Sequence, residues 1–296
     1  MNILLVRTGG LGDSVLTLPV ANYIRHLYPG THLHVLGNET MLSVARLSGM
    51  FDSFYSLETG DFYRIYSSEY PSDFLRSFFS RFRDVYFFTA ADKEKITSTV
   101  ITSGARSCYV LNPHLPTNWH RHAVEYLITI LGNSYGYLPV EDFCNIRSEN
   151  SEIGKRRGMV IHPGSGSLTK TWPFERFIRV AEESSLPVSF LLGPAEIERI
   201  GEKDLAGNRF TVFRTDSLDE VYHMLSGAEV YLGNDSGISH LASLCDTKSV
   251  VLFGPTDPLL WKPFGRKVTI VSSHDGTMDS IGVEQVLETL EATVSM

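Results

Sequence analysis

Short apolar runs alternate with amphipathic segments through most of the first half of the chain. Asn2–Val6 is a continuous apolar run, as expected for a strand that is buried on both faces. The segment after it places apolar residues on one side of a helix, at Leu16, Val20, Tyr23 and Ile24. The same alternation predicts further strands and helices at His32–Leu36, Glu39–Leu47, Val85–Phe88, Lys93–Thr102, Ser107–Leu111 and Arg121–Leu131. Strands that alternate with helices in this way favour a parallel sheet.

The second half of the chain begins the same pattern again. Its predicted strands and helices are Met159–His162, Pro173–Ser184, Pro187–Leu192, Ser217–Leu225, Glu229–Leu232, Ser249–Phe253, Val268–Val271 and Val283–Leu290. Residues 133–157, between the two series, contain Gly, Pro, Asn and Ser and end in a charged run. We therefore predict an α/β protein of two doubly wound domains, residues 1–152 and 153–281, with a cleft between them.

Composition narrows the class of protein. The 296 residues are 43% hydrophobic and 20% charged, which is ordinary for a globular protein. A net charge of −8 argues against a nucleic-acid-binding protein with a large basic face. The three cysteines have no metal-ligand spacing and fit structural thiols in a reducing compartment. No apolar run approaches the roughly 20 residues that span a bilayer, and the first strand is too short for a signal peptide, so we expect a cytoplasmic protein.

The most informative stretch is Glu229–Pro258, which reads as strand, turn, helix, strand and turn. Asn234, Asp235 and Ser236 are all good N-cap residues, so the helix should begin there. Ser236 and His240 are four residues apart and share the helix face that is not apolar. Free amides, a hydroxyl and an imidazole at a helix N-terminus form a site suited to phosphate or another anion.

A second turn follows the next strand, at Gly254, Pro255, Thr256 and Asp257. Each turn alone has a structural explanation, since Asp235 can serve as a helix cap and Pro255 as a rigid turn residue. Two such turns at neighbouring strand ends are more specific, because ligands of open α/β sheets bind at that edge. Asp235, His240 and Asp257 do not have the spacing of a metal site, so we expect none.

The turn after the first strand carries Gly9, Gly10, Gly12 and Asp13. This spacing is not that of a dinucleotide fingerprint, which places a dehydrogenase last among the candidate functions. Asp13 has two interpretations. It is either the cap of the following helix or a general base that faces the cleft.

Two further turns of the second half carry candidate side chains. Lys170 lies in a small-residue loop and is either a solvated surface residue or a cation for a leaving diphosphate. The glycines at Gly164 and Gly166 would let backbone amides approach the same ligand. Glu196 is either a ribose ligand or an acidic residue favoured in the first turn of a helix.

The aromatic and basic segment Asp73–Arg83 is predicted to be helical. Its phenylalanines are interpreted as core residues and its arginines as solvated. The alternative is an interfacial surface for an anionic lipid or a sugar-phosphate acceptor.

Four stretches resemble the ADP-heptose glycosyltransferases of bacterial lipopolysaccharide assembly, the heptosyltransferases of glycosyltransferase family nine. They are RTGGLGDSVLTLP (7–19), HPGSGSLTKTWP (162–173), LLGPAEIE (191–198) and GNDSGISHLASL with VLFGPTDP (233–258). The resemblance implies a GT-B fold, with parallel sheets of two Rossmann-like domains facing across the cleft. It also implies metal-independent, inverting transfer of a heptose from ADP-heptose to a glycolipid, without a cofactor.

The resemblance also implies roles for particular residues. The general base falls on Asp13, with Gly9, Gly10 and Gly12 on the acceptor side. The cation for the phosphates falls on Lys170. The ribose ligand falls on Glu196 or Glu198. The rest of the donor site falls on Gly164, Ser165, Gly166, Thr169, Asp235, Ser236, Gly237, His240, Gly254, Pro255, Thr256 and Asp257.

Other implications stay open. Residues 50–135 match no motif of the family, so the acceptor is a lipopolysaccharide inner core, another surface glycan or a protein. The resemblance also implies that a C-terminal helix, at about residues 282–296, packs back on the first domain. If the acceptor is a glycolipid, the protein is expected to contact the inner membrane peripherally. The alternative functions are a nucleotide-sugar epimerase or hydrolase and a non-catalytic sugar-nucleotide-binding module.

Overall fold

The computed structural model describes residues 1–67, 70–132, 156–199 and 210–295. The chain divides into two compact units, Met1–Ile146 and Arg147–Met296. The domain boundary predicted after residue 152 lies outside the described residues and stays a prediction. No helix in the described ranges has the length and apolar character needed to cross a membrane.

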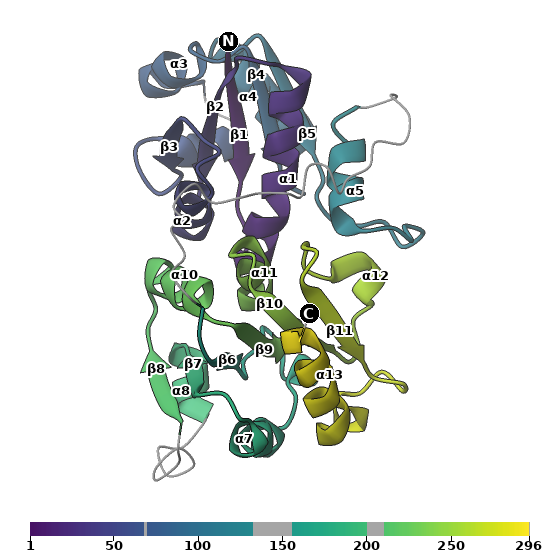
Figure 1. The fold of residues 1–296 in the computed structure, drawn as a ribbon. Helices are drawn as coiled ribbons and strands as arrows, with labels where there is room; N and C mark the ends of the chain where they lie inside the picture. Colours follow the sequence, from purple (N-terminus) through teal and green to yellow (C-terminus); the bar gives the residue numbers. More distant parts are fainter. Residues whose placement is uncertain (68–69, 133–155, 200–209, 296) are drawn as a thin grey trace. The chain divides into compact units, whose positions relative to one another are not determined.

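Unit 1 is built on a five-stranded parallel sheet with the strand order β3-β2-β1-β4-β5 (Figure 1). Its strands are β1 Asn2–Arg7, β2 His32–Gly37, β3 Ser53–Ser56, β4 Asp84–Phe88 and β5 Ser107–Leu111. The central strand β1 is buried because it pairs on both sides, with Leu5 between Val35 and Tyr86. This order, which reverses direction beside β1, is that of a doubly wound sheet.

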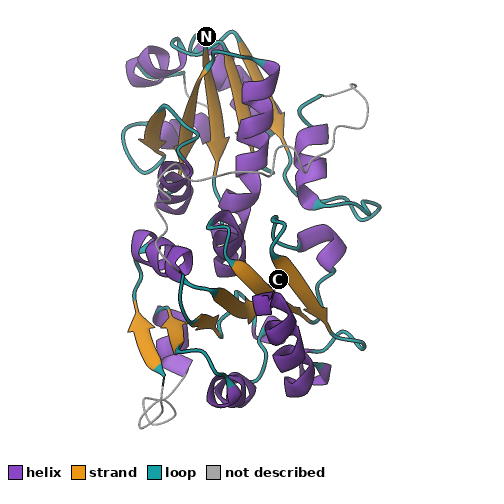
Figure 2. Ribbon diagram, viewed as in Figure 1, coloured by secondary structure: helices purple, strands orange, loops and turns teal. Residues whose placement is uncertain are grey.

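Helices cover both faces of this sheet (Figure 2). They are α1 Leu11–Leu27, α2 Glu39–Ser48, the 3-10 helix η1 Phe62–Tyr66, α3 Asp73–Phe79, α4 Lys93–Thr102 and α5 Ala123–Thr129. Helix α1 packs beside α2 and α5, whereas α4 packs beside η1 and α3. The aromatic residues Phe78, Phe79 and Phe82 are buried in the core with Val85 and Phe87 of β4. The core interpretation of these phenylalanines is therefore confirmed, although the predicted helix 73–83 ends at Phe79.

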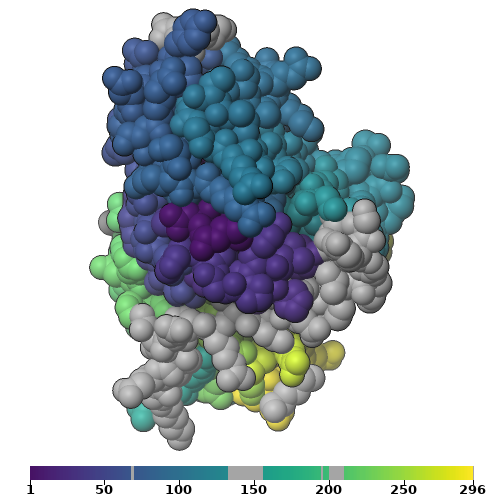
Figure 3. Space-filling model, turned by 90° about the horizontal axis from the view of Figure 1, so that it is seen from above, coloured from purple at the N-terminus to yellow at the C-terminus, as the bar shows by residue number. Residues whose placement is uncertain are grey.

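The start of the chain is held against the segment that follows α3. The side chain of Asn2 donates a hydrogen bond to the carbonyl oxygen of Arg81 over 3.2 Å. The Arg83 amide donates to the Asn2 carbonyl oxygen over 3.0 Å. Figure 3 shows this surface of unit 1, with the purple first residues next to blue residues.

Unit 2 has a six-stranded parallel sheet with the order β11-β10-β9-β6-β7-β8. Its strands are β6 Met159–His162, β7 Val188–Leu192, β8 Thr211–Arg214, β9 Val230–Asn234, β10 Lys248–Phe253 and β11 Val268–Ser272. Its helices are η2 Leu168–Lys170, α7 Phe174–Glu183, α8 Pro194–Arg199, α10 Leu218–Gly227, α11 Gly237–Leu244, α12 Pro258–Trp261, η3 Met278–Ser280 and α13 Val283–Ser295. The two parallel, helix-covered sheets confirm the predicted fold class.

The core of unit 2 includes residues of its last helix. Val283, Val286 and Leu290 of α13 are buried together with Trp172 and Phe177, which are completely inaccessible. Helix α13 packs against α7 and against β9, β10 and β11. The apolar side of this helix therefore packs against the sheet of unit 2.

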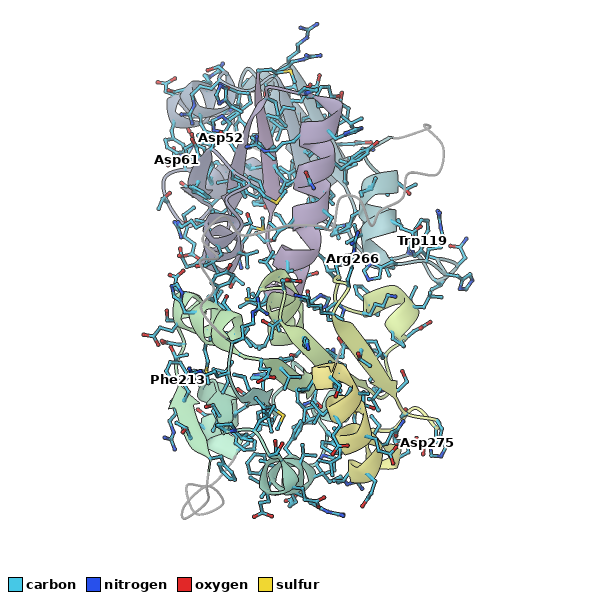
Figure 4. All side chains as sticks on the ribbon, in the orientation of Figure 1. Asp52, Asp61, Trp119, Phe213, Arg266 and Asp275 are labelled. Atoms are coloured by element: carbon cyan, nitrogen blue, oxygen red, sulfur yellow. The ribbon has the colours of Figure 1, made fainter. Side chains whose placement is uncertain are left out.

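Two edge strands were not predicted from the sequence. β3 lies at one edge of the first sheet and β8 at one edge of the second. Phe213, labelled in Figure 4, belongs to β8 and is only partly buried, as are all four residues of β3. An edge strand pairs on one side only, so its sequence needs no continuous apolar run.

Candidate functional site

Four turns of unit 2 leave the carboxyl ends of neighbouring strands. They follow β7, β6, β9 and β10, which are adjacent in that order in the sheet. Because the strands are parallel, all four turns lie at the same edge. The predicted donor-binding residues therefore belong to one edge of one sheet, although they are spread over about 100 residues of sequence.

The side chain of Asp235, after β9, joins three of these turns. Its carboxylate oxygen Oδ2 accepts a hydrogen bond from Lys170 Nζ over 3.1 Å and from Thr256 Oγ1 over 2.7 Å. Its backbone oxygen accepts from Ser165 Oγ over 3.0 Å. The Asp235 side chain is 8% exposed and that of Lys170 is 25% exposed. The ammonium group is thus fixed at the sheet edge by a carboxylate and remains within reach of a ligand.

The loop that carries Lys170 is attached to β9 at both ends. The Asn234 side chain, which is completely buried, donates to the Pro163 carbonyl oxygen over 2.8 Å. Its Oδ1 accepts a hydrogen bond from the Trp172 amide over 3.1 Å. The Trp172 indole in turn donates to the Ile281 carbonyl oxygen over 3.0 Å. A buried amide that makes bonds in both directions is costly to disturb, so it fixes the path of the loop.

Helix α11 begins beside this ion pair. Ser236 is its N-cap residue, and its hydroxyl accepts a hydrogen bond from the Ser239 amide over 3.4 Å. The helix start predicted from the caps is therefore confirmed. Gly237 is the first helical residue, so the amides and the positive end of the helix dipole lie next to Asp235. His240, expected on the same face as Ser236, is buried with 4% of its surface exposed.

Glu196 sits between two glycine-containing turns. Its Oε2 accepts a hydrogen bond from the Gly193 amide over 3.0 Å and lies 4.0 Å from His162 Nε2. A Cβ atom added at Gly164 would overlap the Glu196 carboxylate, so a larger residue there would displace that side chain. Burial lowers the pKa of His162 to about 4 and outweighs the opposing effect of Glu196. Glu198, the other candidate ribose ligand, is exposed.

The remaining predicted residues of unit 2 have local structural contacts. Asp257 caps α12, where its carboxylate accepts a hydrogen bond from the Leu259 amide over 2.8 Å. The hydroxyls of Ser167 and Thr169 are 2.9 Å apart in the loop that carries Lys170. Added side-chain atoms at Gly254 would collide with Met278, whereas Gly166 has open space. Gly254 is thus needed for packing, and Gly166 leaves the backbone open to a ligand.

In unit 1, Asp13 lies in the first turn of α1. Its Oδ2 accepts a hydrogen bond from the Gly10 amide over 3.1 Å, which is a capping contact. Its Oδ1 accepts from the guanidinium of Arg7 over 2.9 Å. The Asp13 side chain is 48% exposed, whereas that of Arg7 is 7% exposed. Asp13 is therefore both a cap and the exposed half of an ion pair.

The glycine turn before α1 is shaped around Asp13. Gly9 has a φ of +150°, which side chains rarely adopt, and a Cβ there would lie 2.8 Å from the Cβ of Asp13. Asn38 holds this turn by donating to the Gly9 carbonyl oxygen over 3.0 Å. Arg7, Asn38 and His162 were not predicted from the sequence as site residues. Each is a polar residue at or just after the end of an apolar strand, which is the signal that would have found it.

The described residues contain no cluster of three or more His, Cys, Asp or Glu side chains able to hold a metal ion. Burial raises the pKa of the Cys108 and Cys245 thiols to about 12 in each case. Both thiols are thus protonated at neutral pH, which fits the structural role expected for them. Cys144 lies outside the described residues.

Comparison with known proteins decides the family. Residues 105–290 match the model of glycosyltransferase family 9 (heptosyltransferase). The chain belongs to this family. It is therefore a glycosyltransferase, as the resemblance of its motifs implied. The matched range contains all six strands of unit 2 and with them the four turns of the candidate site.

Individual relatives agree with this assignment. Lipopolysaccharide heptosyltransferase 1 of Pseudomonas aeruginosa is 25% identical over 298 residues, covering 90% of this chain and 82% of that protein. The structure of E. coli ADP-heptose lipopolysaccharide heptosyltransferase II has a TM-score of 0.77 at 17% identity and covers 100% of this chain and 99% of that one. The structure of E. coli heptosyltransferase WaaC with ADP has a TM-score of 0.70 at 18% identity, with coverages of 99% and 100%. The likeness to these two structures establishes the GT-B fold.

Proposed function

We propose that the protein transfers a heptose-type sugar from ADP-heptose to an acceptor of the lipopolysaccharide inner core or a related surface glycan. The observation that carries this proposal is the position of Lys170, which Asp235 holds beside the N-terminus of α11. An ammonium group and the first-turn amides of a helix supply the positive charge that a diphosphate needs. The family membership and the relatives named above support the choice of sugar and nucleotide.

In this proposal unit 2 binds the donor. Lys170, Ser236 and the amides from Gly237 onward hold the diphosphate and stabilise the charge that develops as ADP leaves. Thr256 supports the arrangement through Asp235. Glu196 accepts hydrogen bonds from the ribose, and Glu198 does not. The reason is that Glu196 lies at the glycine turn beside the other donor residues, whereas Glu198 is exposed.

Unit 1 then provides the general base. The acceptor hydroxyl attacks the anomeric carbon of the heptose, on the side opposite the phosphate, and its proton passes to Asp13. A bond forms between the acceptor oxygen and this carbon as the bond to the phosphate oxygen breaks, so the configuration is inverted. Arg7 orients Asp13, because its guanidinium donates to the carboxylate oxygen Oδ1.

We further propose that transfer requires no metal ion, because Lys170 and the α11 N-terminus meet the charge of the diphosphate. We place the enzyme in the cytoplasm, at the inner membrane where a glycolipid acceptor is presented. Several exposed aromatic residues of unit 1 suit peripheral contact with a membrane, namely Tyr63, Tyr66, Tyr70 and Phe74.

Titration calorimetry with ADP, GDP and UDP tests the donor half of this proposal. ADP should bind most tightly, and at 100 times its dissociation constant it should stabilise the protein by about 2.7 kcal/mol. Addition of EDTA should leave the affinity for ADP unchanged. Preference for UDP would contradict the assignment of the donor, and absence of nucleotide binding would indicate a purely structural role.

A further inference from the structure

His162 and Glu196, which belong to two different sequence motifs 34 positions apart, form a buried pair. His162 ends β6 and is 6% exposed, and Glu196 of α8 is 9% exposed. The distance from His162 Nε2 to Glu196 Oε2 is 4.0 Å. The proposed transfer reaction gives Glu196 a task but leaves this histidine without one.

The two oxygens of the Glu196 carboxylate are not equivalent. Oε2 faces His162 and accepts the hydrogen bond from the Gly193 amide. Oε1 lies against Gly164 and accepts no hydrogen bond from any residue that the structure describes. A nearly buried carboxylate oxygen is stabilised strongly by a hydrogen bond, because burial removes it from water. Oε1 is therefore the oxygen available to a ligand.

The chemistry of His162 suits this arrangement. At neutral pH its ring is uncharged, since burial lowers its pKa to about 4. With the proton on Nε2, the N–H group lies 4.0 Å from the carboxylate oxygen Oε2, beyond hydrogen-bond distance but close enough for its dipole to favour the negative charge. The other tautomer would turn a nitrogen lone pair toward the anion. Nδ1 is then a bare acceptor, and it has no hydrogen-bond partner among the described residues.

We infer that His162 is a positioning residue for nucleoside recognition, which together with Gly164 holds the Glu196 carboxylate so that Oε1 meets the ribose hydroxyls of the donor. This inference rests on the proposed function, which assigns the ribose to Glu196. It predicts a requirement for a ribonucleotide. A deoxynucleotide leaves Oε1 buried without a donor, and its binding is weakened accordingly.

Calorimetric titration with ADP, 2′-deoxy-ADP and 3′-deoxy-ADP tests this inference. A hydrogen bond to a charged group corresponds to a preference of about 10- to 100-fold for ADP over at least one deoxy analogue. The variants His162→Leu and Gly164→Ala should reduce this preference to about threefold or less, because each displaces the carboxylate. His162→Gln, which keeps an N–H group, should restore part of it. Glu198→Gln is the matched control and should retain the preference.

The possible outcomes distinguish the role of His162 from the assignment of Glu196 as the ribose ligand. If Glu196→Gln retains the full preference for ADP, the ribose assignment is wrong. If Glu196→Gln loses the preference while His162→Leu and Gly164→Ala retain it, only the role of His162 is overturned. Thermal melts show which variants fold, and Gly164→Ala still reports on the carboxylate if His162→Leu does not fold.

Discussion

Asp13→Asn is expected to lower the rate of heptose transfer by about 100- to 10,000-fold, which is the usual contribution of a general base. The amide keeps the size of the carboxylate, and its oxygen can still accept the hydrogen bond from Arg7. It cannot take a proton from the acceptor hydroxyl. Binding of ADP should be unchanged, since the proposed donor residues belong to unit 2. Single-turnover transfer from ADP-heptose measures the first effect, and calorimetry with ADP measures the second.

Asp73→Asn is the matched control for this experiment. Asp73 is also an acidic residue in the first turn of a unit 1 helix, but no role in the reaction is assigned to it. Its replacement tests whether loss of a negative charge near a helix N-terminus is itself harmful. Full activity of the Asp73 variant is expected. Full activity of Asp13→Asn as well would remove Asp13 from the reaction, and a parallel loss of ADP affinity would assign it to binding instead.

Lys170→Met is expected to weaken ADP binding by about 10- to 100-fold and to lower the transfer rate by about 100- to 1,000-fold. The methionine keeps the unbranched side chain up to its ε position but removes the charged amino group. The substitution also leaves the Asp235 carboxylate, which is 8% exposed, without its cation at the place proposed for the diphosphate. Repulsion between this carboxylate and the ligand adds to the loss of the direct contact.

The double variant Lys170→Met with Asp235→Asn separates these two contributions. Removing the carboxylate charge relieves the repulsion, so the double variant should bind ADP more tightly than Lys170→Met alone. Thr256 can still donate its hydrogen bond to the asparagine oxygen. If the losses of ADP binding free energy in the two single variants add up in the double variant, Asp235 contacts the ligand and does not position Lys170. Calorimetric affinities of the four proteins complete this cycle.

The sequence was sufficient to predict the interior strands of both sheets. β1 and β10 are buried on both faces, so an unbroken apolar run marks each of them. The edge strands β3 and β8 could not be predicted in this way. Each has four residues, all of them partly or largely exposed, and the tertiary pairing with β2 or β7 rather than a local pattern determines them.

The turns of the candidate site were also visible in the sequence, but the contacts between them were not. Nothing in the local pattern indicates that Asp235 accepts hydrogen bonds from both Lys170 and Thr256. That contact depends on the order in which the strands lie in the sheet. Asp13 shows a different limit. The cap and base interpretations were treated as alternatives, whereas one carboxylate oxygen caps α1 and the other pairs with Arg7.

We propose that this enzyme transfers the sugar of its donor to an acceptor without a metal ion. The most direct measurement combines ADP-heptose with a lipopolysaccharide acceptor that lacks heptose, in the presence of EDTA, and follows both released ADP and the mass of the acceptor. The acceptor should gain one heptose for each ADP released, and little ADP should appear without acceptor. Equal release of ADP without acceptor would indicate hydrolysis of the donor and would rule out the proposed transfer.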